Sequence, residues 1–232
     1  MISPSKTQQH GAEYSEKLSI SEPLHARETE AIYNEICKLS KDDMAKRFSI
    51  KGKILDSVYE NYSKFKSLET TPAIMAYTGF VFKGLEIASY GLEEWEYITE
   101  HIRILSAFYG NLRPLDAIKA YRLDYKSKLD INLYDYWRET LIEDFKGETI
   151  VNLASDEFSK SVKLDMVTIK FLDEKDGKFK TIGTYAKQAR GLFLNEIIKK
   201  HIDKLSSLKE ISVMDYKFCE NMSDEKLFVF KR

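Results

Sequence analysis

The sequence has 232 residues, of which 43% are hydrophobic and 12% aromatic, enough for a sizeable core in one domain spanning residues 1–232. Its 36 Lys and Arg side chains nearly balance 37 Asp and Glu side chains, for a formal net charge of −1. This balance excludes a protein that coats nucleic acid over its whole surface, because such proteins are clearly basic. Any anion-binding site must therefore be a local cluster of cationic side chains.

The sequence also indicates where the protein resides. No stretch approaches the roughly 20 apolar residues that a membrane span needs, and the N-terminal region has no apolar signal core. Cys37 and Cys219 are far apart and form no CxxC motif, which fits a reducing compartment. The histidines show no metal-ligand spacing, so we predict no metal site and no cofactor. We expect a cytoplasmic monomer that does not contact membranes.

The first half of the chain is predicted to be mainly helical. Apolar residues recur at helical spacing over 29–39 and 52–65, and Ser40 followed by Asp43 predicts a capped helix start between them. Residues 73–85 are instead rich in β-branched and aromatic side chains, which favours an extended segment with a bulge or turn. A further helix is expected over 92–109.

The second half mixes helices and strands. Helices are expected over 133–145 and 187–205, and strands over 149–155, 210–218 and 226–232. Residues 165–186 favour a hairpin whose turn, at Asp176 and Gly177, requires a positive φ. Because these elements show no regular βαβ alternation, we predict an α+β fold with a mixed sheet flanked by helices.

The first candidate site is a break in the helical pattern within residues 102–125. Gly110 can end one helix in the left-handed conformation, and Pro114 suits the first turn of a second, short helix. The free N–H groups at that second helix favour a phosphate, so the segment is typical of a helix-hairpin-helix element. A plain turn between two packed helices is the alternative. Four cationic side chains surround the break: Arg103, Arg113, Lys119 and Arg122.

Three further candidates lie elsewhere in the chain. Lys187 and Arg190 are three residues apart at a helix start, where cations are disfavoured unless an anion is present, and Tyr185 lies beside them. Asn152 and Ser155 follow an apolar strand, where they position a ligand or, alternatively, form a turn and a helix N-cap. Lys6 is the last candidate. A solvated basic helix face remains the alternative for the Lys187 cluster.

Several motifs resemble a known family. The segments ISPSKT, RILSAFYGNLRPLDAIKAYRLDY, IVNLASDEF and GTYAKQARG occur in the order seen in the peroxide stress protein YaaA family. The resemblance implies a bacterial, cytoplasmic α+β protein of the oxidative stress response that helps cells survive hydrogen peroxide. It also implies a basic cleft with a helix-hairpin-helix-like element that binds double-stranded DNA. The chain departs from the family pattern at Phe80, Phe82, Ala107 and Phe158.

Two hypotheses follow from these residues. In the first, the protein binds the phosphate backbone of double-stranded DNA non-specifically, through the Gly110 turn and six cations: Lys6, Arg103, Arg113, Arg122, Lys187 and Arg190. In the second, the protein is an enzyme whose same cleft takes a small phosphorylated or nucleotide-like ligand. Its ligand-positioning residues would be Asn152, Ser155 and Tyr185. The sequence identifies no nucleophile–base pair, so the presence of catalysis stays open.

Overall fold

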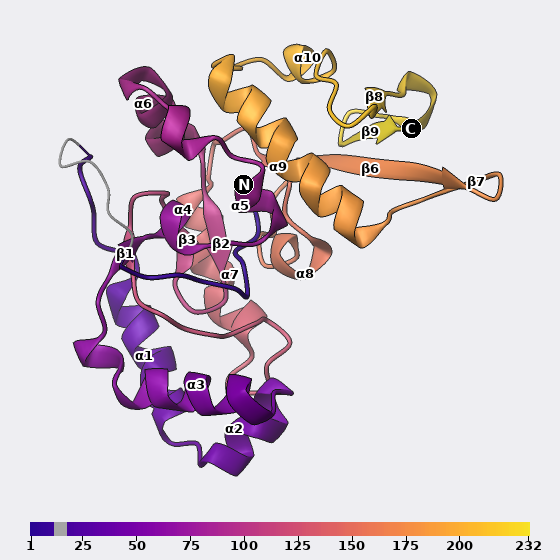
Figure 1. The fold of residues 1–232 in the computed structure, drawn as a ribbon. Coiled ribbons are helices and arrows are strands. Elements are labelled where there is room, and N and C mark those ends of the chain that lie inside the picture. The colour runs from indigo at the N-terminus through magenta and orange to yellow at the C-terminus, as the bar shows by residue number, and fades with distance from the viewer. Residues whose placement is uncertain (12–17) are drawn as a thin grey trace.

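Residues 26–67 form a helical layer, at the lower end of the ribbon in Figure 1. The structure, a computed structural model, describes residues 1–11 and 18–232. The layer contains α1 (Ala26–Cys37), α2 (Lys41–Phe48), α3 (Gly52–Ser63) and a 3-10 turn, η1 (Phe65–Ser67). The expected cap is confirmed, because the Ser40 hydroxyl accepts a hydrogen bond from the Asp43 backbone N–H. Ile32, Ile36 and Tyr62 form the buried side of the layer.

The middle of the chain consists of short elements. In chain order they are β1 (Thr71–Pro72), α4 (Ala73–Ala76), α5 (Phe80–Lys83), η2 (Ile87–Ser89), α6 (Leu92–His101), β2 (Ile104–Ser106), β3 (Gly110–Leu112) and β4 (Ala117–Ile118). The extended segment predicted over 73–85 is wrong, since α4 and α5 occupy it. Each of these helices has only four residues, too few for a helical repeat of apolar residues to appear in the sequence.

The predicted helix-hairpin-helix over 102–125 is also wrong, because these residues form strands and loops. The helix expected over 92–109 ends at His101, and β2 then pairs with β3 as an antiparallel hairpin. Gly110 does have a positive φ, of 73°, but within this hairpin. Ile2 pairs in parallel with Ile104, so the N-terminal segment adds backbone hydrogen bonds to β2. Long-range pairing of this kind overrides the local helical pattern.

The C-terminal half builds the larger sheet. Its elements are α7 (Leu133–Asp144), β5 (Val151–Asn152), α8 (Asp156–Ser159), β6 (Val167–Lys175), β7 (Lys178–Lys180), α9 (Gly183–Lys199), α10 (Leu205–Leu208), β8 (Lys217–Phe218), η3 (Glu220–Met222) and β9 (Leu227–Lys231). The strand order is β5-β6-β9-β8, with β7 paired to β6. Strand β6 is parallel to β5 and β9, whereas β7 and β8 are antiparallel to their neighbours, so the predicted mixed sheet of an α+β fold is confirmed.

The turn predicted at Asp176 and Gly177 is confirmed, with φ values of 56° and 70°. It joins β6 to β7 in a hairpin that projects beyond the rest of the molecule, with α9 running back across the sheet (Figure 1). The ring of Phe193 on α9 packs edge-on against Phe171 of β6 and Phe230 of β9. In the part of the chain that the structure describes, no helix is long and apolar enough to cross a membrane.

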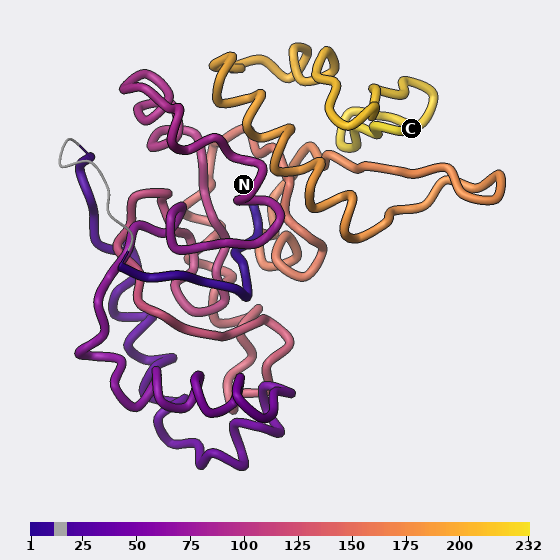
Figure 2. Tube along the Cα trace, in the orientation of Figure 1, coloured from indigo at the N-terminus to yellow at the C-terminus, as the bar shows by residue number. Residues whose placement is uncertain are grey.

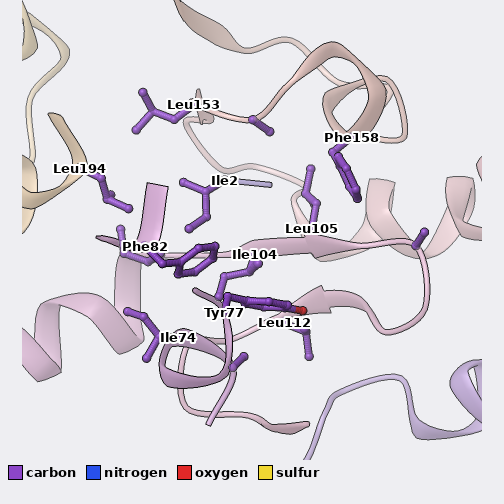
Figure 3. Close-up of a cluster of buried hydrophobic side chains, with 14 of the residues drawn as sticks. Ile2, Ile74, Tyr77, Phe82, Ile104, Leu105, Leu112, Leu153, Phe158 and Leu194 are labelled. Atoms are coloured by element: carbon purple, nitrogen blue, oxygen red, sulfur yellow. The ribbon is translucent and has the colours of Figure 1, made fainter. Parts of the chain in front are cut away.

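One hydrophobic cluster connects these parts. Figure 3 shows Ile2 from the N-terminal segment among side chains of α4, α5, the β2–β3 hairpin and α9. Ile2, Ile74, Ile104 and Leu112 are at most 1% exposed. The tube in Figure 2 shows the N-terminal segment crossing the centre of the molecule, beside the chain of α5. Burial of the Ile2 side chain therefore fixes the position of the polar residues that follow it in sequence.

Candidate functional site

A cleft of about 560 Å³ opens where segments from both halves of the chain meet. Its walls come from residues 3–8, 78–83, 121–124, 153–158 and the first half of α9. Five of the predicted site residues line this cleft: Lys6, Arg122, Ser155, Lys187 and Arg190. The cluster at the start of α9 and one arginine of the 102–125 segment therefore share a concave surface, although more than sixty residues separate them in sequence.

Backbone hydrogen bonds hold the N-terminal wall of the cleft. The Ile2 N–H donates to the Arg103 carbonyl at 2.9 Å, and the Thr78 N–H donates to the Thr7 carbonyl at 3.1 Å. Ser3 Oγ accepts a hydrogen bond from the Ser155 N–H at 2.9 Å and lies 3.3 Å from Ser155 Oγ. Ser155 is the N-cap residue of α8, as one reading of the sequence predicted, although its hydroxyl does not cap the helix.

Glycines allow the other walls to approach closely. A Cβ on Gly79 would lie 2.5 Å from Ser5 Oγ, and a Cβ on Gly84 would lie 2.7 Å from the Gly191 backbone. A Cβ on Gly191 would collide with the Val81 carbonyl oxygen. Glycine is required wherever two backbones come this close. The contact between α5 and α9 therefore depends on Gly84 and Gly191, and it brings Phe80 to the cleft that Arg190 lines.

The cleft carries more positive than negative charge. Lys6 forms an ion pair with Asp124, with 2.6 Å between Nζ and Oδ2. Lys83, Arg122 and Lys187 form no ion pair with any described side chain. Lys83 and Lys187 are exposed, and Arg122 is half-buried. Together with Arg190, five cationic side chains face two acidic ones, Asp124 and Glu157.

Arg190 is the cation most deeply set in the cleft. Its Nε is buried and has no hydrogen-bond partner among the described residues. Burial lowers the pKa of the Arg190 guanidinium, and the nearby Asp156 only partly opposes this effect. An arginine remains charged even so, because its ordinary pKa lies above about 12. A buried N–H donor without a partner is costly, so Arg190 Nε is available to a polar ligand.

Glu157 and Phe80 give the cleft its other chemical features. Glu157 Oε1 is buried and has no hydrogen-bond partner among the described residues, while Oε2 lies 3.5 Å from Lys126 Nζ. The Phe80 ring is 44% exposed, whereas Phe82 and Phe158 are buried in the same wall. Two positions that depart from the family pattern, Phe82 and Phe158, are thus core residues, whereas the Phe80 side chain is exposed and Lys83 Nζ lies over its ring.

A chain of buried hydroxyls lies beneath the cleft. The Tyr121 hydroxyl lies 2.7 Å from that of Tyr77 and 2.8 Å from Ser106 Oγ, which accepts hydrogen bonds from two backbone N–H groups of the β2–β3 turn. Burial raises the pKa of Tyr121 to about 12. The phenol is therefore neutral at physiological pH and acts as a hydrogen-bonding group that orders the wall.

Three predicted anion-binding residues lie outside the cleft. Arg113 Nε donates to Asp116 Oδ1 at 2.9 Å, and its Nη2 donates to the Glu22 carbonyl at 2.8 Å. Asp116 is fully buried, so Arg113 forms a structural ion pair where the sequence had predicted a phosphate contact. Gly110 is buried against the Trp137 ring. Arg103 lines a second cavity, of about 550 Å³, and donates to the Thr99 and Ile102 carbonyls.

The two other ligand-positioning candidates also have partners within the protein. Asn152 is buried; its amide donates to Thr168 Oγ1 at 3.2 Å and its carbonyl oxygen accepts from the Ala154 N–H at 2.8 Å. Tyr185 is exposed beside the cleft residues of α9, and the Arg232 guanidinium lies 4.8 Å from its ring centroid. Within residues 1–11 and 18–232, no group of three or more His, Cys, Asp and Glu side chains is placed to hold a metal ion.

Sequence reasoning missed three cleft residues: Phe80, Lys83 and Glu157. Phe80 and Lys83 lie in α5, which was predicted to be extended. Glu157 follows Ser155 by two residues, so the polar run after the strand at 149–155 was a usable signal for it. Its unpaired oxygen, in contrast, results from tertiary packing and has no local signature.

Comparisons with known proteins identify the family of this chain. The family model for peroxide stress protein YaaA matches residues 1–222. A UPF0246 protein of Crocosphaera subtropica is 34% identical over 227 aligned residues, which cover 91% of each chain. A UPF0246 protein of Fusobacterium nucleatum is 32% identical and covers 100% of this chain and 98% of its own, and one of Idiomarina loihiensis is 34% identical with 100% and 97% covered. This chain belongs to the peroxide stress protein YaaA family.

Proposed function

We propose that this chain acts in the bacterial response to peroxide by binding double-stranded DNA through its phosphates, with little base preference. The observation that carries the proposal is the local charge of the cleft, where Lys6, Lys83, Arg122, Lys187 and Arg190 face only two carboxylates. The chain as a whole has a net charge of −1, so this surface differs from the average of the molecule. Clustered cations of this kind bind the nucleic-acid backbone and release its counterions.

A helical hairpin elsewhere in the fold gives the proposal a second support. Residues Ser49–Lys51 connect α2 to α3, and Gly52 opens α3 with a φ of 58°. Lys51, Gly52 and Lys53 are exposed, no side chain caps α3, and its first turn has no acidic residue. The free N–H groups at such a start favour a phosphate. We assign to this hairpin the phosphate-binding role that the sequence had suggested for residues 102–125.

The test is the binding of fluorescent duplexes of two unrelated sequences over a series of salt concentrations. We expect similar affinities for both duplexes and a linear decrease of log K with log salt, because phosphate contacts release counterions. The double variant Lys51→Ala/Lys53→Ala should reduce the slope of that line by up to about two. Lys146→Ala/Lys204→Ala, which removes two exposed lysines outside the cleft and the hairpin, is the control. No binding at low salt, or a strong sequence preference at high salt, would contradict the proposal.

The second candidate function is an enzyme acting on a small phosphorylated or nucleotide-like ligand in the same cleft. The buried Arg190 Nε favours this function. A cleft of about 560 Å³ has room for a single nucleotide but not for a duplex, so only a small ligand can reach a buried donor there. Mass spectrometry of the freshly isolated protein tests for a co-purified ligand. A bound phosphate ester that Arg190→Gln abolishes, with duplex affinity unchanged, would place this candidate ahead of DNA binding.

A further inference from the structure

The cleft holds one unpaired donor and one unpaired acceptor. Arg190 Nε–H and Glu157 Oε1 are both buried without a hydrogen-bond partner among the described residues, and no ion pair joins the two side chains. Each such orphan is costly, because a buried polar group has lost its contacts with water and gained no partner. A phosphate would satisfy Arg190, but Glu157 would repel it. A ligand that satisfies both groups must present an acceptor and a donor, as the edge of a nucleobase does.

The Phe80 ring supplies a flat surface beside these two groups. It is 44% exposed and lines the same cleft, although a phenylalanine on a cleft wall is ordinarily covered. Exposed aromatic rings in polar clefts are typical stacking surfaces for bases. Lys83 Nζ lies 6.0 Å from the centroid of the Phe80 ring, so a cation stands next to the stacking surface.

The exposed cations complete the arrangement. Lys83 and Lys187 line the cleft, are exposed and form no ion pair with a described residue, whereas Glu157 and Arg190 are more deeply buried. We propose that the cleft binds a purine nucleotide base-first: the base edge contacts Arg190 and Glu157, the ring stacks on Phe80, and the phosphate meets Lys83 and Lys187. This inference rests on the second candidate function and adds the class of ligand and its orientation.

The first experiment separates recognition of the base from recognition of the phosphate. Guanosine 5′-monophosphate and ribose 5-phosphate are titrated into the protein in a calorimeter. We expect the nucleotide to bind at least about tenfold more tightly, since stacking and the base edge act only on it. Equal affinities would overturn the base-first inference and leave the second candidate function standing. If neither compound binds, both fail.

Two variants test the assigned contacts. Phe80→Ala should weaken the nucleotide about tenfold and leave ribose 5-phosphate unchanged. Phe179→Ala, which removes a similarly exposed ring on β7 outside the cleft, is the matched control. Glu157→Gln keeps the side-chain volume and removes a negative charge, so it should weaken the nucleotide and strengthen ribose 5-phosphate. A parallel loss for both compounds in either variant would mean that the residue only maintains the fold, and would overturn its assignment.

The nucleotide can be free in solution or turned out of a nucleic acid, and a competition experiment distinguishes these sources. A fully paired duplex and a duplex with one unpaired guanine are each added to protein loaded with guanosine 5′-monophosphate. If only the second duplex displaces guanosine 5′-monophosphate, the natural ligand is a base turned out of DNA, because an unpaired base is the least costly to unstack. Displacement by neither identifies a free nucleotide. If both duplexes displace guanosine 5′-monophosphate equally, in the parent protein and in Phe80→Ala, then the duplexes compete through their phosphates alone. That result would overturn the inference.

Discussion

Arg113 and Arg190 illustrate how differently two arginines of one protein can be used. Arg113 contacts a buried carboxylate and a backbone carbonyl, so its donors are satisfied within the protein. Arg190 is also partly buried, yet its Nε has no partner among the described residues. From sequence, both were predicted to bind anions. The comparison teaches that the partners of a cation, and not its position in a basic segment, separate a structural charge from one that is available to a ligand.

The largest expected effect follows from removing the satisfied arginine. Arg113→Ala should lower the free energy of unfolding by about 3 kcal/mol, because it leaves the fully buried Asp116 carboxylate without its cation. Arg190→Ala, measured alongside it by urea denaturation, should change stability by less than about 1 kcal/mol because no ion pair is lost. Equal losses in the two variants would remove the distinction between these arginines.

The next effect concerns the contact that positions Arg190. Gly191→Ala should destabilise the protein by about 2 kcal/mol, since the added methyl group meets the Val81 carbonyl. Gly183→Ala, at the open start of the same helix, is the control; it should be neutral or stabilise by about 0.5 kcal/mol. The melting temperatures of both variants, compared with that of the parent, test this prediction. A Gly191→Ala protein as stable as the parent would show that α5 can move away from α9 at no cost.

A smaller, pH-dependent effect extends the comparison to a titratable pair. His25 Nε2 lies 2.7 Å from Asp144 Oδ2, and this hydrogen bond raises the pKa of His25 above its ordinary value, against the effect of burial. The pair is therefore fully stabilising below the unfolded-state pKa of about 6.5 and loses its contribution as pH rises through the folded-state pKa. We expect the free energy of unfolding to fall as the pH rises from about 6.5 through the raised folded-state pKa of His25. In His25→Gln this decrease should largely disappear, and its persistence would assign it to other groups.

The smallest effect on stability is expected at Lys187. This side chain is exposed and unpaired among the described residues, so Lys187→Ala should change stability by less than about 0.5 kcal/mol. If it contacts a DNA phosphate, the log–log salt slope of duplex binding should fall by about one. An unchanged slope would confine the DNA contacts to other cations.

Much of the fold could be predicted where a pattern extends over several turns. The helical repeat identified α1, α3, α7 and α9, and Asp176 with Gly177 predicted the β6–β7 turn. Residues 73–85 and 102–118 were misassigned because their elements have only two to four residues and depend on partners far along the chain. Local sequence carries no information about a partner such as Ile2.

The candidate site could be predicted in part. The clusters around Lys187 and Arg122 were identified from charge, and the fold brings them to one cleft with Lys6. Arg113 was misassigned although Asp116, three residues later, is a potential ion-pair partner in the sequence. The exposure of Phe80 and the unpaired Glu157 oxygen could not be predicted, because burial and missing partners arise only when distant segments pack.

The N-terminal segment has a consequence for the order in which the molecule assembles. Ser3 is synthesised well before its partner Ser155, which lies 152 positions later in the chain, and Arg190 follows later still. Contacts of such long range are slow to form, because the loop that they close is large. The cleft is therefore completed late, after Ile2 has joined the β2–β3 hairpin. A chain that ends before α9 lacks Lys187 and Arg190 and therefore cannot form this cleft.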